Sequence, residues 1–408
     1  MISLFTEAKH IKTHIPIASS KSESNRALII RALTQGYSEL RNLSSARDTQ
    51  TLVRLLKSEG HVLDVIDAGT TMRFLTAYCC AAGRDQILTG TPRMCKRPIG
   101  ILVEALKELG AEIEYWKQKS FPPLHIISKG RQMEGGEISI RGDVSSQFIS
   151  ALLMIAPVLK NGLSLNLTGN ITSRPYTEMT INLMKHFGVE AIWEDNKIRV
   201  PEKAYVANDY TIESDWSSAS YWYSIVALSE NGEISLPGYK RNSFQGDHKI
   251  AEFMRYFGVS TEFTNDGIRL RKIDPEMPDD LVIDFTETPD LAQTIAVVSA
   301  AKAMPIRMKG LHTLRVKETD RIQALQNELG KFGVSMDEGS EGVFAISGTY
   351  QSSDAIVETY DDHRMAMAFA PLVFHQQKLM IKNPGVVVKS YPEYWKHLER
   401  VGVKITEW

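Results

Sequence analysis

Hydrophobic residues recur along the chain at the spacing of amphipathic helices, and one series of these helical patterns ends in glycine. Glycine readily adopts the left-handed conformation that terminates a helix. The glycines follow one another at intervals of about 69 to 78 residues, which is regular enough to predict an internal repeat. The helix-ending glycines are Gly110, Gly188, Gly258, Gly333 and Gly402.

A second marker supports the same repeat, because a charged residue opens a turn of small or polar residues that leads into an apolar helix. The turns begin at Lys21, Asp67, Asp143, Asp215, Asp290 and Asp361. They are about 71 to 76 residues apart, except for the first interval of about 46 residues. We therefore predict six units and a first unit shortened by about 25 residues, which would lack one helix and one strand between Arg47 and Asp67.

The residue pattern within a unit predicts a helix, a strand, a second helix and a pair of strands. In the third unit these elements are expected at residues 145–159, 163–167, 176–187, 191–194 and 197–200. An Asp or Ser before each first helix is typical of an N-cap. The fold class is therefore α/β, with repeated units.

Units of about 70 residues are larger than the repeats of a thin solenoid, so two globules of three units each are more plausible. The N-terminal stretch has no helix of its own, and as a strand it would complete the last unit. We therefore expect an inserted domain at residues 18–214 and a discontinuous domain at residues 1–17 plus 215–408.

Composition narrows the class of protein. The net charge of −2 provides no overall positive field for nucleic acid or for an anionic membrane surface. The sequence has no secretory signal and no apolar run of about 18 residues, so we expect a cytoplasmic protein.

Three cysteines without a C-x-x-C pair argue against a disulfide scaffold and a zinc site. Cys79 and Cys80 are expected in the core, whereas Cys95 has cationic neighbours that would favour a reactive thiol.

The sequence contains none of the common glycine-rich nucleotide, zinc-protease or serine-hydrolase motifs. What stands out is a series of cations at predicted helix starts and turns, where the helix dipole disfavours positive charge. An anionic ligand with phosphate and carboxylate groups would explain that placement. The cations are Lys21, Arg26, Arg73, Arg97, Arg315, Lys317, Arg321, Arg364 and Lys389.

Acid–base candidates lie in the same segments, at Asp290, Glu318 and His363. Three further aspartates stand directly before predicted helices and are expected to be N-caps. These are Asp143, Asp215 and Asp361.

Six segments together resemble a known family. They are Ser20–Leu28, Asp67–Arg73, Pro92–Ile99, Gly142–Phe148, Arg315–Arg321 and Asp362–Met367. In this order, from about Pro16 to the C-terminus, they are similar to the 5-enolpyruvylshikimate-3-phosphate synthases, a family of enolpyruvyl transferases.

The resemblance implies two inverse α/β barrel domains and one reaction. The enolpyruvyl group of phosphoenolpyruvate would move to the 5-hydroxyl of shikimate 3-phosphate through a tetrahedral intermediate, with release of phosphate, on the route to chorismate and the aromatic amino acids. Because a C–O bond breaks and the P–O bond does not, we expect neither a metal nor a cofactor. The expected partners are the two small-molecule substrates, without nucleic acid or membrane, and the expected state is a monomer.

The resemblance also implies roles by motif position. Shikimate 3-phosphate would be bound by Lys21, Ser22, Arg26, Ser145, Ser146, Gln147, Ser173, Asp290 and Lys317. Phosphoenolpyruvate would be bound by Lys21, Gly69, Arg97, Gln147, Arg321, Arg364 and Lys389. The implied catalytic residues are Lys21, Asp290 and Glu318. Asp290 would take the hydroxyl proton and Glu318 would exchange protons with the methyl carbon, although the two roles could be interchanged between steps.

The sequence departs from the usual family pattern at several positions. The turn before Lys21 is one residue longer, and Asp67, Phe74 and Thr313 stand where the family commonly has Asn, Pro and Asn. Gly69 is retained, which suggests that the site could admit glyphosate. We expect catalysis to survive the short first unit, because every motif lies outside the gap.

Two other functions fit parts of the pattern. The sibling enolpyruvyl transferase that acts on UDP-N-acetylglucosamine carries its loop Cys several residues before an Arg-Pro pair, whereas Cys95 is two residues before Arg97. A repeat-built anion-binding protein without catalysis would give no reason for Asp290 and Glu318 among the cations.

Overall fold

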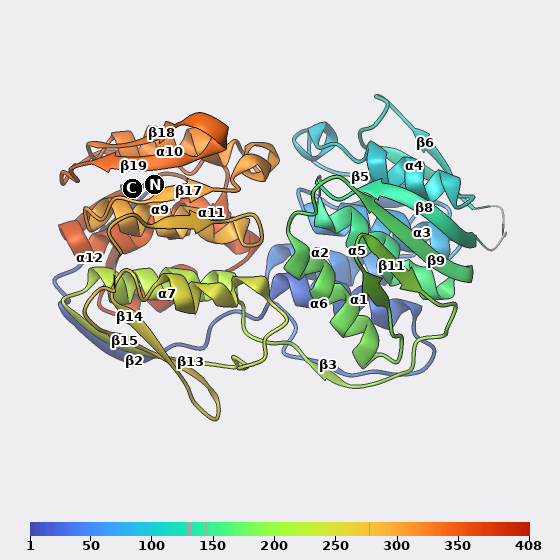
Figure 1. Ribbon diagram of the computed structural model, residues 1–408, viewed down its shortest axis with the longest axis horizontal. Helices are drawn as coiled ribbons and strands as arrows, with labels where there is room; N and C mark the ends of the chain where they lie inside the picture. Colours follow the sequence, from blue (N-terminus) through green and yellow to red (C-terminus); the bar gives the residue numbers. More distant parts are fainter. Residues whose placement is uncertain (129, 131–132, 144, 277) are drawn as a thin grey trace. The chain divides into compact units, whose positions relative to one another are not determined.

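The chain forms an α/β structure, as the sequence predicts, and its described residues contain six small sheets. A computed structural model describes residues 1–128, 130, 133–143, 145–276 and 278–408, so Val144 of the Gly142–Phe148 motif lies outside the described residues. The chain divides into two compact units (Figure 1). Unit 1 contains Met1–Ala18 and Glu213–Trp408, and unit 2 contains Ser19–Ile212.

Five of the six sheets share one topology, in which a parallel pair of strands is followed by two antiparallel neighbours. This common order confirms the predicted repeat. In unit 1 the sheets are β20(Ile356–Val357)-β21(Lys378–Ile381)-β1(Ile2–Phe5)-β22(Lys404–Glu407), β2(His10–His14)-β13(Asn231–Pro237)-β15(Gly267–Lys272)-β14(Val259–Phe263) and β16(Val282–Asp284)-β17(Arg307–Lys309)-β19(Phe344–Gly348)-β18(Val334–Glu338). In unit 2 they are β4(Val62–Asp64)-β5(Gln86–Thr89)-β7(Leu124–Ile127)-β6(Glu112–Tyr115) and β8(Glu134–Arg141)-β9(Lys160–Thr168)-β11(Lys197–Val200)-β10(Ile192–Glu194).

The sixth sheet belongs to the shortened first unit and consists only of the parallel pair β3(Leu40–Arg41) and β12(Tyr210–Thr211). The second helix of that unit, α2(Arg47–Leu56), is present. The prediction that a helix and a strand are missing is therefore wrong, because the unit lacks the antiparallel strand pair instead. That pair forms one edge of every other sheet, so its loss leaves the parallel pair intact.

The N-terminal segment completes two sheets of unit 1. Strand β1 lies between β21 and β22, where Leu4 is fully buried and is paired with Leu379 and Ile405. Strand β2 runs parallel to β13. The expectation that an N-terminal strand completes the last unit is confirmed.

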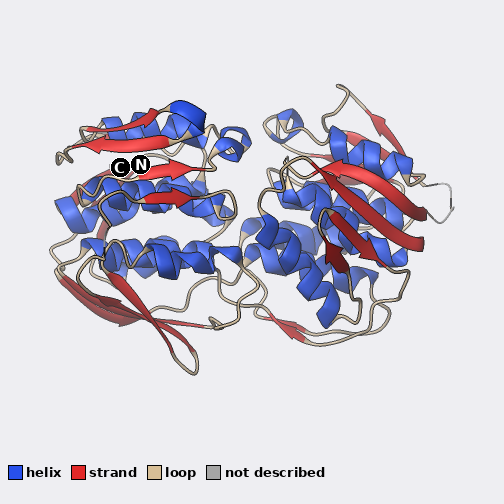
Figure 2. Cartoon of the chain, in the orientation of Figure 1, coloured by secondary structure: helices blue, strands red, loops and turns tan. Residues whose placement is uncertain are grey.

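Three helices, the first of each repeat, pack against one another in each unit, and the sheets lie outside them (Figures 1 and 2). In unit 2 these inner helices are α1(Lys21–Leu33), α3(Gly69–Ala81) and α5(Ser146–Ile155). In unit 1 they are α7(Trp216–Leu228), α9(Ala292–Ala301) and α11(His363–Phe369), and every residue of these three is buried. A helix surrounded by other elements must be compatible with burial on all sides, which accounts for their sequences of mostly apolar and small residues.

The remaining helices are amphipathic or short. They are α2, α4(Gly100–Glu108), α6(Arg174–His186), α8(Ile250–Phe253), α10(Arg321–Gly330), α12(Val373–Gln376) and α13(Tyr394–Glu399). The five predicted helix-ending glycines follow such helices with φ between 75° and 91°, so their predicted left-handed conformation is confirmed.

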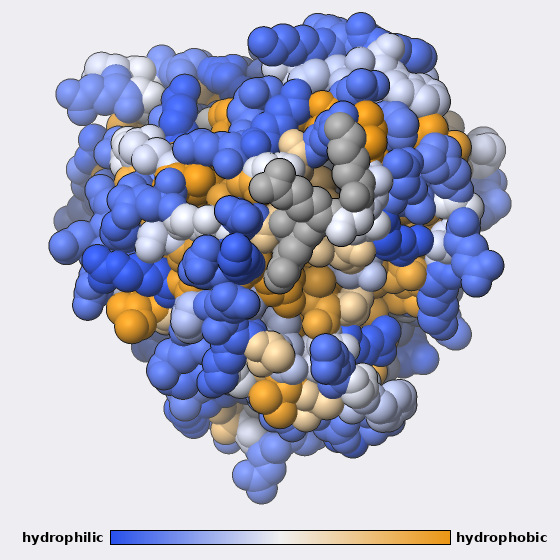
Figure 3. All heavy atoms as spheres, turned by 90° about the vertical axis from the view of Figure 1, so that its right-hand side faces the viewer, coloured by the Kyte–Doolittle hydropathy of each residue, from blue (hydrophilic) through white to orange (hydrophobic). Residues whose placement is uncertain are grey.

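The face of unit 2 in Figure 3 is covered largely by hydrophilic residues, with hydrophobic residues in small groups between them. In the described parts of the chain, each helix is too short or too polar to cross a bilayer.

Candidate active site

The inner helices of unit 1 begin close to one cluster of charged side chains. Asp290 lies in the 3-10 turn Pro289–Leu291 before α9, and Arg364 is the second residue of α11. Arg321 is the first residue of α10, which Asp320 caps by accepting from the backbone N–H groups of Ile322 and Gln323. Acidic caps at these helix ends offset the unfavourable placement of arginines there.

Arg321 is the centre of the cluster and contacts three carboxylates. Its Nη1 donates to Asp290 at 2.9 Å, its Nη2 to Glu318 at 3.0 Å, and its Nε to Asp362 at 2.7 Å. The Arg321 side chain is only 2% exposed. The planar guanidinium suits this arrangement, because its donors point in fixed directions toward separate acceptors.

Asp362 serves two functions in this network. One of its oxygens accepts from the backbone N–H of Arg364 and caps α11, while the other accepts from Arg321. The predicted cap, Asp361, has a positive φ of 55° and accepts from Asn383. That prediction is wrong by one residue, since the residue before a helix needs an extended backbone to cap it.

Asp290 is held by two arginines. Its second oxygen lies 2.9 Å from Nη2 of Arg364, which is mostly buried. Burial disfavours the charged carboxylate, but Arg364, Lys317 and Arg321 outweigh that effect and hold the pKa of Asp290 well below its usual value. Asp290 is therefore ionised across the physiological pH range.

Lysines complete the unit 1 cluster. Lys389 Nζ lies 3.5 Å from the second oxygen of Glu318, and the Lys389 side chain is 4% exposed. Lys317 is half-buried, and desolvation lowers its pKa despite the opposing effect of Asp290. The structure therefore brings together the predicted residues Asp290, Lys317, Glu318, Arg321, Arg364 and Lys389.

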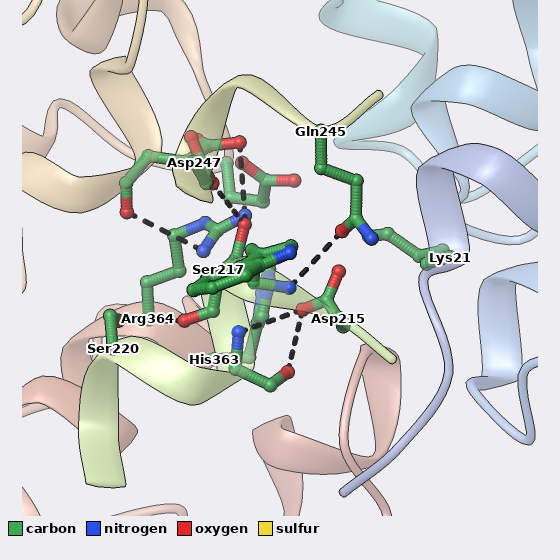
Figure 4. A network of polar contacts seen from close by, with 12 residues as sticks. Lys21, Asp215, Ser217, Ser220, Gln245, Asp247, His363 and Arg364 are labelled. Carbon is green, nitrogen blue, oxygen red and sulfur yellow. Dashed lines mark hydrogen bonds and ion pairs between the residues drawn. The ribbon is translucent and has the colours of Figure 1, made fainter. Parts of the chain in front are cut away.

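Asp247 is a buried carboxyl beside this cluster that the sequence analysis did not identify. Ser217, near the start of α7, donates to Asp247 and accepts from Arg364, so it lies between them (Figure 4). Burial, reinforced by the charge of Asp290, raises the pKa of Asp247 to about 7. Asp247 follows a glycine in a short 3-10 turn without a counterpart among the repeat markers, so no pattern pointed to it.

Asp215 caps α7 as predicted, because it accepts from the backbone N–H and the hydroxyl of Ser218. Asp143 does not cap α5. It pairs with Arg141, and the cap is Ser145, which accepts from the backbone N–H of Gln147. Ser145 follows Asp143 by two residues and directly precedes α5, which explains the difference.

In unit 2, Lys21 opens α1 and its Nζ donates to Asp48 at 3.1 Å. Asp48 is a buried acidic residue of α2 that the sequence analysis did not identify. Ser20 caps α1, and Ser22 follows Lys21 on the first turn. The ammonium of Lys21 is thus placed at a helix N-terminus by a carboxylate from the neighbouring helix.

Gly69 and Arg97 occupy adjoining space in unit 2. A Cβ at residue 69 would lie 2.5 Å from Nη1 and 2.8 Å from Nη2 of Arg97, so only glycine leaves room for this guanidinium. Arg73 donates to the carbonyls of Gly69 and Pro98, and therefore links the two segments that carry this pair. Gln147 Nε2 contacts the hydroxyl of Thr70, next to Gly69, at 3.3 Å.

Arg26 is enclosed by unit 2. Its guanidinium donates to Thr180, to Ser150 and to the carbonyl of Ser22, and it lies over the ring of Phe74. Burial lowers the pKa of Arg26 to about 10. Its side chain is 2% exposed, and its contacts hold α1 against α5 and α6.

The other predicted residues lie at helix starts or apart from the clusters. Ser146 opens α5, and Ser173 precedes α6 with a left-handed φ of 53°. Arg315 is exposed, with its guanidinium 2.7 Å from Glu338, and it contributes a surface ion pair. His363 is buried as the first residue of α11.

These features define an α/β protein with six repeated units whose buried helices begin at clusters of arginines, lysines and carboxylates. A scan against protein-family models matches EPSP synthase (3-phosphoshikimate 1-carboxyvinyltransferase) over residues 5–61 and 53–398. The chain belongs to this family.

Individual relatives agree with the match. A 3-phosphoshikimate 1-carboxyvinyltransferase from Bacteroides fragilis is 49% identical over 98% of both chains, and one from Vibrio campbellii is 34% identical over 95% of this chain and 96% of its own. A solved structure of EPSP synthase from Acinetobacter baumannii has the same fold, with a TM-score of 0.81 at 20% identity over 100% of this chain and 99% of its own. The predicted family and enolpyruvyl transferase activity are confirmed.

Proposed function

We propose that the Arg321 cluster performs the acid–base and anion-binding steps when the enolpyruvyl group of phosphoenolpyruvate is transferred to shikimate 3-phosphate. The observation that carries this proposal is that one buried guanidinium holds both predicted acid–base groups, Asp290 and Glu318, at 2.9 Å and 3.0 Å. Asp362 alone would complete a structural ion pair with Arg321, whereas this arrangement also fixes Asp290 and Glu318 around the same cation.

The reaction requires two proton transfers in the addition step. As the 5-hydroxyl oxygen bonds to the central carbon of phosphoenolpyruvate, the hydroxyl loses a proton and the methylene carbon gains one. Asp290 is ionised and would accept the hydroxyl proton. Glu318 in its protonated form would donate to the methylene carbon.

Elimination reverses one of these transfers. The C–O bond to phosphate breaks, and phosphate leaves with the bonding electrons and takes the hydroxyl proton from Asp290. Glu318 takes a proton from the methyl carbon to regenerate the double bond, so both carboxyl groups return to their starting states. Positive charge develops at the central carbon in both steps, and the carboxylates of Asp290 and Glu318 would stabilise it electrostatically.

The cations would hold the anionic groups of the substrates. Arg321, Arg364 and Lys389 would bind phosphoenolpyruvate, together with Arg97, the backbone at Gly69, Gln147 and Lys21. The groups for shikimate 3-phosphate would be Lys21, Ser22, Arg26, Ser145, Ser146, Gln147, Ser173, Asp290 and Lys317. Guanidinium groups suit this task because they bind phosphate and carboxylate through paired donors.

Release of phosphate from phosphoenolpyruvate by the purified protein tests the activity. We expect release only when shikimate 3-phosphate is present, and we expect it to persist in EDTA. Release driven by UDP-N-acetylglucosamine, or no release with either acceptor, would contradict the proposal.

We further propose that the enzyme is monomeric and cytoplasmic. Light scattering during size-exclusion chromatography should then give a mass of about 46 kDa.

Substitutions separate the proposed roles from folding. Asp290→Asn and Glu318→Gln keep the side-chain shapes and should each lower kcat by about 10²- to 10⁴-fold with little change in KM for phosphoenolpyruvate. Asp280→Asn, in an exposed ion pair with Arg307, is the matched control and should leave kcat unchanged. Near-normal kcat in either of the first two variants would remove that residue from the proposed chemistry.

A further inference from the structure

Two histidines and an aspartate meet on one sheet of unit 2, and none of them belongs to the residues discussed above. His61 directly precedes β4, Asp85 directly precedes β5, and His125 lies in β7. These three strands are adjacent in the sheet, in the order β4-β5-β7. The backbone of Ile87 donates to the carbonyl of His61 at 2.8 Å, which fixes the first two segments relative to each other.

The side-chain donor atoms converge on one oxygen of Asp85. Its Oδ1 lies 3.1 Å from Nε2 of His125 and 3.7 Å from Nδ1 of His61. All three donor atoms lie within 4.8 Å of one another. Ligand atoms about 2.0–2.1 Å from a tetrahedral zinc ion are ~3.3 Å apart, so two of the three separations already resemble those of a zinc site.

We propose that His61, Asp85 and His125 bind a divalent transition-metal ion, with Zn²⁺ as the reference ion. Two imidazole nitrogens and a carboxylate oxygen are ligands that suit Zn²⁺, Ni²⁺ and Cu²⁺ better than Ca²⁺ or Mg²⁺. The fourth position of the ion faces solvent and takes water. The most distant pair of donor atoms lies within 4.8 Å, so the His61 ring must move for all three donors to reach one ion.

The surroundings of the three residues favour metal binding. One oxygen of Asp85, Oδ1, already faces Nε2 of His125 at 3.1 Å. The other oxygen of Asp85 accepts from the backbone N–H of Ser128 at 3.3 Å, which orients the carboxylate. The ring of Trp116 lies edge-on to the His125 ring, with 6.4 Å between the ring centroids.

The bound ion would link three separate segments of one sheet, at a place where their side chains are partly exposed. It would therefore stabilise unit 2 without taking part in enolpyruvyl transfer. This separates the two proposals, because metal binding is measured without substrates and the transferase assay runs in EDTA.

The test is calorimetric titration of Zn²⁺ into metal-free protein that carries no histidine tag. We expect one ion per chain at micromolar Zn²⁺, and titration with Co²⁺ should give the visible absorption bands of a four-coordinate site. His125→Ala and Asp85→Asn should each weaken Zn²⁺ binding by about tenfold or more. The matched control is His10→Ala, which removes an exposed histidine of β2 and should bind Zn²⁺ like the unaltered protein.

Circular dichroism and transferase activity in EDTA show whether each variant is folded. Absence of binding at 100 µM Zn²⁺, or equal affinity in folded His125→Ala and in His10→Ala, would overturn the proposal. If the protein does not bind Zn²⁺ but retains transferase activity, the metal-site proposal fails and the proposed function stands.

Discussion

The guanidinium of Arg97 fills the space where a side chain at residue 69 would begin. A Cβ on Gly69 would lie 2.5 Å from Arg97 Nη1 and 2.9 Å from Cζ, closer than real contacts allow. Gly69 has an ordinary helical placement at the start of α3, so the constraint comes from Arg97 and not from the backbone.

Gly69→Ala should displace Arg97 and weaken the binding of phosphoenolpyruvate. Loss of a charge-assisted contact is worth roughly 1.5–3 kcal/mol, so we expect KM for phosphoenolpyruvate to rise by about 10- to 100-fold. KM for shikimate 3-phosphate should change less, and steady-state kinetics measures both. Gly330→Ala is the control, because a Cβ there meets no atom within 4 Å. An unchanged KM for phosphoenolpyruvate in Gly69→Ala would remove Arg97 from its proposed role.

Arg321→Lys should damage both stability and catalysis although it keeps the charge. A lysine ammonium cannot reproduce the fixed donor directions that reach Asp290, Glu318 and Asp362. We expect unfolding free energy to fall by about 3 kcal/mol and kcat/KM by at least about 100-fold. Denaturant titration and phosphate release measure these effects. Arg307→Lys, in a surface ion pair, should change neither, and a similarly mild Arg321→Lys would contradict the bridging role.

Asp247 should make stability depend on pH. Its pKa is about 7 in the folded protein and near the ordinary 3.8 in the unfolded chain, so the folded state holds an extra proton between these values. The contribution of Asp247 to the free energy of unfolding therefore falls as pH rises from 3.8 to about 7. Above pH 7 the whole free-energy cost of burying the ionised carboxylate remains. Asp247→Asn removes the cost while retaining an acceptor for Ser217.

We accordingly expect Asp247→Asn to be more stable than the unaltered protein at pH 8, by on the order of 2–4 kcal/mol, and to lose that advantage toward pH 4. Denaturant titrations at pH 8, 6 and 4.5 measure the difference. A constant difference over this range would show that the carboxyl does not titrate as described.

The three cysteines should differ in reactivity. Cys79 and Cys80 are buried in α3, and burial raises the pKa of Cys79 to about 12 and that of Cys80 further. Cys95 is partly exposed. A thiol-reactive chromophore at pH 7.5 should therefore modify one cysteine per native chain and all three after denaturation. Rapid modification of two or more native thiols would mean that α3 opens far more readily than its packing indicates.

The repeat was predictable because a left-handed glycine after a helix is a local requirement that recurs in every unit. The missing part of the first unit was not predictable, since a gap of about 25 residues fits a helix plus a strand as well as it fits two strands. Helix caps could be placed only approximately. Asp361 and Asp362 are equally suitable residue types, and the backbone conformation alone decides between them.

The charged cluster was predictable as a set of residues but not as a network. Arg321, Asp290 and Glu318 are separated by up to 31 positions along the chain, and nothing in their spacing shows that one guanidinium serves both carboxylates. Asp247 could not be predicted from the sequence, because a buried carboxyl that contacts a serine has no characteristic pattern of neighbouring residues.

The place of β1 between β21 and β22 sets an order for folding during synthesis. The ribosome completes the whole of unit 2 before it makes the two strands that flank β1, so β1 must wait without its partners while about 370 further residues emerge. Unit 2 can fold from one continuous stretch of chain, whereas unit 1 can close only after translation reaches β22. Until then the apolar side chains of Ile2 and Leu4 and the backbone edges of β1 have no native partners and are open to pairing with other strands.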